Sequence, residues 1–90
     1  MINVLVKADN LEVNEVSDGY VIYEAALDRV HYLNNTAAVV FELCDGERDI
    51  EAIVLRVAEL FNLEATACDN EVRSCIESLS KEGLVLSRSK

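Results

Sequence analysis

The spacing of apolar residues changes from strand-like to helical at one place in the chain, between residues 30 and 46. Val30 to Leu33 alternates β-branched and aromatic residues as strands do, and Asn34 and Asn35 after it are both good helix caps. From Thr36 to Asp45 the apolar residues recur at helical spacing, and Gly46 supplies the positive φ that often closes a helix. The pattern predicts a strand that leads directly into an amphipathic helix.

Two further strands are predicted upstream of this corner. Leu11 to Val16 alternates apolar and polar residues, with a shift at Val16 that suggests a bulge, and Ser17-Asp18-Gly19 is the strongest hairpin signal in the chain. The next run, Tyr20 to Tyr23, should pair antiparallel with the first, and Val30 to Leu33 extends the sheet. Three short strands cannot close into a barrel, so the predicted sheet keeps a free edge.

Two more helices are predicted downstream. Asp49 is a favourable N-cap for a helix from Ile50 to Phe61, and Asp69 or Asn70 caps a third helix that runs to Lys81. The apolar positions at helical spacing predict a core face in each helix. These positions are Ile53, Val54, Val57, Leu60 and Phe61 in the second helix, and Val72, Cys75, Ile76 and Leu79 in the third.

The ends of the chain are less regular. Gly83 terminates the third helix, Leu84 to Leu86 forms a last short strand or a wing, and Ser87 to Lys90 is predicted to be a frayed tail. Asn3 to Lys7 is either a short strand or a loose arm, and Leu63 is expected to tuck under the fold. Ninety residues make one domain with one modest core. The fold class is α+β and winged helix-turn-helix-like: a three-stranded antiparallel N-terminal sheet followed by three helices.

The composition limits the partners and the kinds of chemistry expected of this protein. With 17 acidic and 8 basic side chains the net charge is −9, which repels a phosphate backbone, so nucleic acid is disfavoured as a partner. His31 is the only histidine, and Cys44, Cys68 and Cys75 lie too far apart in sequence for a metal site, so neither an enzyme nor a cofactor is expected. We expect reduced thiols, with Cys44 and Cys75 in the core and Cys68 partly exposed. No apolar run is long enough to span a membrane, which favours a cytoplasmic protein.

One run of the sequence resembles a known family. Leu33 to Phe61, LNNTAAVVFELCDGERDIEAIVLRVAELF, is similar to the PqqD family, in which a strand ends in Leu-Asn, a helix starts with Thr-Ala-Ala, and Asp-Gly and Arg precede a helix with Ile. The Asp18-Gly19 hairpin matches the opening strands of that family. Residues 71–85, EVRSCIESLSKEGLV, match its third helix and Gly-Leu-Val exit. The resemblance covers roughly residues 11 to 86.

The resemblance implies a domain that recognises a peptide and is not an enzyme. In that family the domain holds the leader of a ribosomally made, post-translationally modified precursor peptide as an added strand, and presents it to a modifying enzyme, often of the radical SAM type, as in pyrroloquinoline quinone biosynthesis. On this chain the edge is Val30 to Leu33 and the facing helix is Glu71 to Leu79. The implied peptide-binding residues are Val30, His31, Tyr32, Leu33, Val72, Arg73, Cys75 and Ile76.

Strand alternation divides the roles of the strand residues. His31 and Leu33 point to one face and Val30 and Tyr32 to the other, so we expect Leu33 in the core, while Tyr32 either lines the peptide groove or covers the outer face of the sheet. Leu84 stands where members dedicated to pyrroloquinoline quinone usually carry tryptophan, so the resemblance does not specify that pathway. The alternatives are a protein–protein adaptor without a role in peptide modification and a divergent winged-helix regulator.

Overall fold

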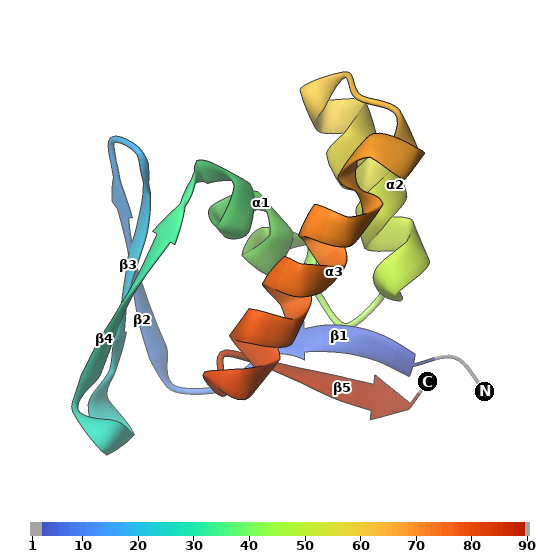
Figure 1. Ribbon diagram of the computed structural model, residues 1–90. Helices are drawn as coiled ribbons and strands as arrows, with labels where there is room; N and C mark the ends of the chain where they lie inside the picture. The colour runs from blue at the N-terminus through green and yellow to red at the C-terminus, as the bar shows by residue number, and fades with distance from the viewer. Residues whose placement is uncertain (1–2, 90) are drawn as a thin grey trace.

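A computed structural model describes residues 3–89, which form two antiparallel sheets and three α-helices (Figure 1). The strands are β1 (Asn3–Lys7), β2 (Leu11–Val16), β3 (Gly19–Glu24), β4 (Arg29–Asn34) and β5 (Val85–Ser89), with a 3-10 helix (Ala25–Leu27) between β3 and β4. The helices are α1 (Asn35–Leu43), α2 (Ile50–Phe61) and α3 (Ala65–Lys81). Strands β2, β3 and β4 form one sheet in that order. The predicted α+β fold, with three antiparallel strands before three helices, is confirmed.

The two ends of the described chain pair to form the second sheet. Asn3 lies opposite Ser89 in β5, and Lys7 lies opposite Val85, so the segment 3–7 is a strand and not a loose arm. The prediction of a frayed tail from Ser87 is wrong as far as Ser89, because these residues belong to the β1–β5 ladder. Lys90, the last residue of the predicted tail, lies outside the described residues.

The predicted hairpin is regular. β2 and β3 pair without interruption from Leu11 opposite Glu24 to Val16 opposite Gly19, so the bulge suspected at Val16 is absent. The prediction failed because a shift in apolar spacing at the end of a strand also arises when both faces of that strand are solvated. Within β2 every residue but Leu11 is exposed, so burial does not constrain its pattern.

Gly19 sits where β3 passes closest to β4. Its φ is 153°, and a Cβ at this position would lie 1.8 Å from the carbonyl oxygen of Leu33. No side chain can be accommodated there without displacing the β4 backbone. The glycine is therefore required both for the hairpin turn and for the close approach of β4 to β3.

Capping residues fix the starts of α1 and α2. The side chain of Asn34 accepts a hydrogen bond from the Ala37 N–H at 2.9 Å, and the side chain of Asp49 accepts one from the Ala52 N–H at 2.9 Å. Both helices begin as predicted, within one residue. α1 ends earlier than predicted, with Cys44 as its C-cap residue.

The third helix begins about one and a half turns before the predicted start. α3 starts at Ala65, so Asp69 and Asn70 lie inside the helix and are not its caps. Glu64 occupies the N-cap position without a side-chain hydrogen bond to the helix, and it is not a residue type that capping rules favour there. The end of the helix agrees with prediction, because Gly83 follows it with a φ of 77°.

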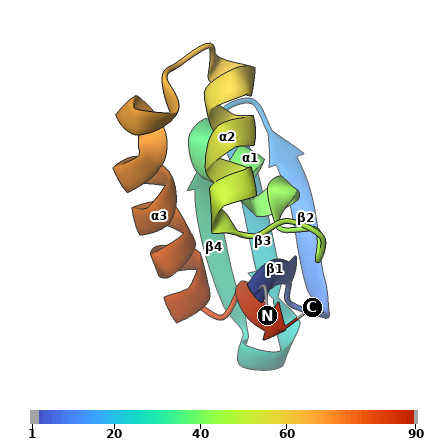
Figure 2. The same ribbon diagram turned by 90° about the vertical axis from the view of Figure 1, so that its right-hand side faces the viewer.

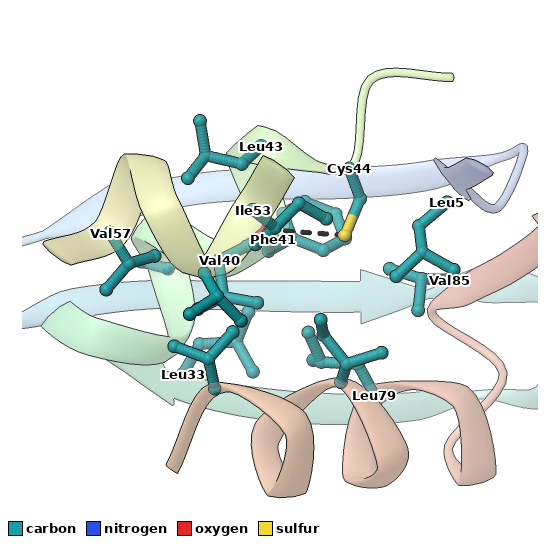
Figure 3. Close-up of a cluster of buried hydrophobic side chains, with 14 of the residues drawn as sticks. Leu5, Leu33, Val40, Phe41, Leu43, Cys44, Ile53, Val57, Leu79 and Val85 are labelled. Atoms are coloured by element: carbon teal, nitrogen blue, oxygen red, sulfur yellow. Dashed lines mark hydrogen bonds between the residues drawn. The ribbon is translucent and has the colours of Figure 1, made fainter. Parts of the chain in front are cut away.

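Phe41 lies at the centre of the core (Figure 3). It is fully buried, its ring meets that of Tyr20 edge-to-face at a centroid distance of 6.4 Å, and the Lys7 ammonium lies 5.2 Å from its ring centroid. Next to it the buried Cys44 thiol donates a hydrogen bond to the Val40 carbonyl at 3.3 Å. Burial raises the pKa of Cys44 to about 12, so this thiol is an inert core group, as predicted.

The predicted core face of α2 is only partly covered. The first three residues of this predicted face are buried as expected: Ile53, Val54 and Val57. Leu60 and Phe61, however, are 50% and 40% exposed, and Leu63 in the linker is 53% exposed instead of tucked under the fold. Helical spacing identifies an apolar stripe, but the last residues of this stripe, Leu60 and Phe61, line an open depression beside α1 and the β2–β3 turn.

The other two cysteines also depart from prediction. Cys68 is buried, because α3 starts early enough to carry it on the core face, whereas Cys75 is only half-buried. All three thiols are free of disulfides, as predicted. Val72, Ile76 and Leu79 are buried as expected.

Replacing Gly19 with alanine tests the close approach of β3 and β4. We expect Gly19→Ala to lower the free energy of unfolding by about 3 kcal/mol or more, because the new methyl group and the Leu33 carbonyl cannot both keep their places. Gly83→Ala is the matched control: no atom lies within 4 Å of a Cβ there, so only the positive φ costs energy, about 1 kcal/mol. Urea unfolding of the two variants would measure the difference, and equal losses would contradict the argument.

Candidate functional site

The outer edge of β4 has no strand beside it. β3 lies between β2 and β4, so within residues 3–89 β4 pairs on one side only. The two-residue turn makes Val16 and Gly19 a hydrogen-bonded pair, and such pairs alternate along an antiparallel ladder. Alternate residues of β3, starting with Tyr20, therefore bond to β4. Their partners on β4 include Leu33 and His31.

The same alternation turns the main-chain groups of Val30 and Tyr32 away from β3. The N–H of Asn34 points the same way, at the residue that caps α1. These groups give an incoming strand a row of donors and acceptors at every second residue. The register thus determines which residues of β4 turn their main-chain groups away from β3, which the sequence alone does not show.

A groove lies between the Asn34 end of this edge and α3. Figure 2 shows the ribbons of β4 and α3 next to each other. A cavity of about 290 Å³ lies between the end of β4, the start of α1 and the middle of α3. It is lined by Asn34, Thr36, Ala37, Glu71, Ser74, Cys75 and Ser78. The α3 residues among them share one face of the helix, and most of their side chains are small. A strand added to β4 would place alternate side chains against this face of α3.

Charged side chains connect the other end of β4 to the end of α3. The Arg29 guanidinium contacts the Glu24 carboxylate at 3.2 Å and donates to the Glu82 carbonyl at 3.3 Å. His31 lies 3.1 Å from the same Glu24 oxygen through Nε2, and its Nδ1 lies 3.6 Å from the Glu82 carboxylate. The hydrogen bond with His31, supported by Arg29 and opposed by burial, lowers the pKa of Glu24. This cluster ties the end of α3 to the sheet.

The structure separates the predicted peptide-binding residues into groups. Leu33, Val72 and Ile76 are buried in the core, at 7%, 0% and 4% exposure, so their side chains present almost no surface to a ligand. Val30 and Tyr32 point to the outer face of the sheet and are 66% and 56% exposed. The Tyr32 hydroxyl donates to the Asp18 carbonyl at 3.2 Å, which holds the ring across the outer face.

The remaining predicted residues lie on different faces. His31 points inward to the charged cluster beside the groove, and Cys75 lines the groove itself. Arg73 points instead toward α2, where it pairs with Glu51, and it also pairs with Asp69 one turn earlier on α3. Peptide contact at these eight residues stays a prediction, but only His31 and Cys75 present side chains to the space between β4 and α3.

Sequence reasoning missed most of the groove lining. Four α3 residues line the groove. Each lies three or four residues from two of the others, a spacing that places them all on one face of the helix: Glu71, Ser74, Cys75 and Ser78. That spacing was available in the sequence. The prediction selected mainly apolar residues of α3 as peptide contacts, whereas most of the α3 side chains that line the groove are polar.

The edge strand, the groove beside α3 and the α1 corner together define a winged-helix-like α+β protein with an open sheet edge. The chain belongs to the family described as Coenzyme PQQ synthesis protein D (PqqD), whose sequence profile matches residues 19–85. This confirms the family suggested by the resemblance. A "PqqA binding protein" from Methylococcus capsulatus (strain Bath) is 34% identical over 53 residues, 59% of this chain. The match spans about half of that relative, 55% of its length.

Two solved structures share the fold. TbiB1 in complex with the TbiA(beta) leader peptide superposes with a TM-score of 0.77 at 13% identity, covering 94% of this chain and 99% of the other. Lasso peptide synthetase B1 complexed with the leader peptide gives a TM-score of 0.75 at 17% identity, covering 91% and 96%. At these identities the likeness shows the fold alone.

The cysteines provide a probe of the groove. We expect a maleimide to label Cys75 first, and Cys44 and Cys68 only on unfolding, because only Cys75 is half-exposed. Burial, followed by the negative charge of Glu71, raises the pKa of Cys75, so its labelling rate should keep rising at pH values where a free cysteine has reached its plateau. Glu71→Gln should lower that pKa and speed labelling at pH 8. Mass spectrometry of timed samples would measure the rates, and a profile like that of free cysteine would contradict this.

Proposed function

We propose that this domain captures the leader segment of a ribosomally made precursor peptide as an added strand on β4, and presents the peptide to a modifying enzyme. One observation carries the proposal: the β4 edge is unpaired within residues 3–89, and its register turns the main-chain groups of Val30, Tyr32 and Asn34 away from β3. A groove lies between the Asn34 end of this edge and α3. Strand addition uses such an edge for main-chain hydrogen bonds and adjacent pockets for selectivity.

The two faces of the added strand would meet different surfaces. Inward side chains of the peptide would enter the groove and meet Ser74, Cys75 and Ser78 of α3. Outward side chains would lie beside Val30 and Tyr32, which are more than half exposed. The edge offers main-chain groups at three positions only, so we infer that a short segment of the leader is held.

The relatives support a role in peptide binding. One relative is named for binding PqqA, and both structural neighbours hold leader peptides. By extension we propose that the partner enzyme modifies the precursor, with the radical SAM type as the class to test first, and that this chain supplies binding without catalysis. The three free thiols suit a reducing compartment, so we place the encounter in the cytoplasm.

A proline scan of β4 tests strand addition. Val30→Pro removes a donor that faces outward, so we expect the fold to survive and leader binding to fall about tenfold or more. His31→Pro removes a donor used by β3, so it should instead destabilise the sheet by about 1 to 3 kcal/mol. Circular dichroism and urea unfolding would report on the fold. Calorimetric titration with synthetic PqqA, the peptide for which the relative is named, would report on binding.

The control separates main-chain from side-chain effects. Val30→Ala keeps the N–H and removes most of the exposed side chain, so it should bind the leader within about threefold of the parent. If Val30→Pro stays folded and binds as well as Val30→Ala, the edge of β4 is not the binding site. The adaptor function would then be favoured.

A further inference from the structure

A second uncovered surface lies at the C-terminal end of α2. Leu60 and Phe61 continue the apolar stripe of this helix but are 50% and 40% exposed, and Val16 at the end of β2 is 39% exposed. These three side chains line the same depression. Apolar side chains that gather around a hollow, instead of lying scattered, are typical of an interaction site.

The depression is larger than the groove beside β4. Its volume is about 560 Å³, and it lies between the β2–β3 turn, α1 and the end of α2. Tyr20, Val39 and Leu43 are among the residues that line it. In Figure 2, α1 and α2 lie between β2 on one side and the pair of β4 and α3 on the other. A partner in this depression therefore leaves the β4 edge accessible.

The rim of the depression is acidic. Glu15 and Glu42 both line it, and after burial their charges and the hydrogen bond to Glu42 raise the pKa of Tyr20. Lys7 pairs with Glu42 at 3.1 Å, whereas within residues 3–89 Glu15 forms no ion pair. A second copy of this chain would bring like-charged rims together on molecules of net charge −9. A basic partner avoids that repulsion.

We propose that this depression docks the modifying enzyme, through a segment that inserts a bulky apolar side chain flanked by lysine or arginine. The identity of the partner rests on the proposed function, but the chemistry of the segment rests on the depression itself. Leu60 and Phe61 supply the apolar contact and Glu15 the charge contact. The leader and the enzyme then bind on opposite sides of α1 at the same time.

Two leucines of α2 provide a matched test. Leu60→Ser should weaken binding of a purified precursor-modifying enzyme of the radical SAM type by about tenfold or more. Leu55→Ser is the control, because Leu55 is 62% exposed on the same helix but does not line the depression. It should change binding less than about twofold. Binding is measured by calorimetry without the leader, and the leader is titrated separately into each folded variant.

A charge pair completes the test. Glu15→Lys should weaken enzyme binding and reduce its salt dependence, whereas Glu12→Lys, with the same change in net charge outside the depression, should not. The proposal is overturned if Leu60→Ser binds like the parent, if the two lysine variants weaken binding equally, or if the parent binds the leader but not the enzyme. Self-association of the parent that Leu60→Ser abolishes would assign the surface to a second copy. Loss of leader binding alone would count against the proposed function and not against this surface.

Discussion

The close approach between Gly19 and the Leu33 carbonyl fixes the register of β4 on β3, and the binding edge depends on that register. A slip of one residue would turn Leu33 to solvent and Tyr32 into the core, and it would also exchange the main-chain groups that face outward. The turn, the buried face of the sheet and the free edge all follow from a position that tolerates only glycine.

Asn34 connects the edge to the helical layer. It ends β4, and its side chain caps α1, so the strand cannot shift without disturbing the helix that carries Phe41 into the core. At the opposite end of β4, Arg29 and His31 reach the end of α3. Polar contacts thus join β4 to α1 at one end of the strand and to the end of α3 at the other, and most of the α3 side chains that line the groove are small.

Local signals in the sequence predict most of the fold. Asp49 and Asn34 locate two helix starts, and Asp18-Gly19 locates the hairpin, because each acts through its own backbone neighbours. The start of α3 was missed because Glu64 provides no capping signal. The exposure of Leu60 and Phe61 was missed because periodicity identifies an apolar stripe but does not show which part of it another element covers. The residues of the candidate site were harder to predict than the fold. Helix α3 turns about 100° per residue, so Arg73 and Cys75 face different partners although only Ser74 separates them.

The pairing of β1 with β5 places both ends of the described chain side by side, away from β4 (Figure 1). Asn3 and Ser89 are register partners, so polypeptide added before the one or after the other would emerge from the same corner of the molecule. Such a layout suits a module. The domain can be inserted into a loop of a larger protein, or tethered to a surface by either terminus, without the attachment crossing the open edge of the sheet.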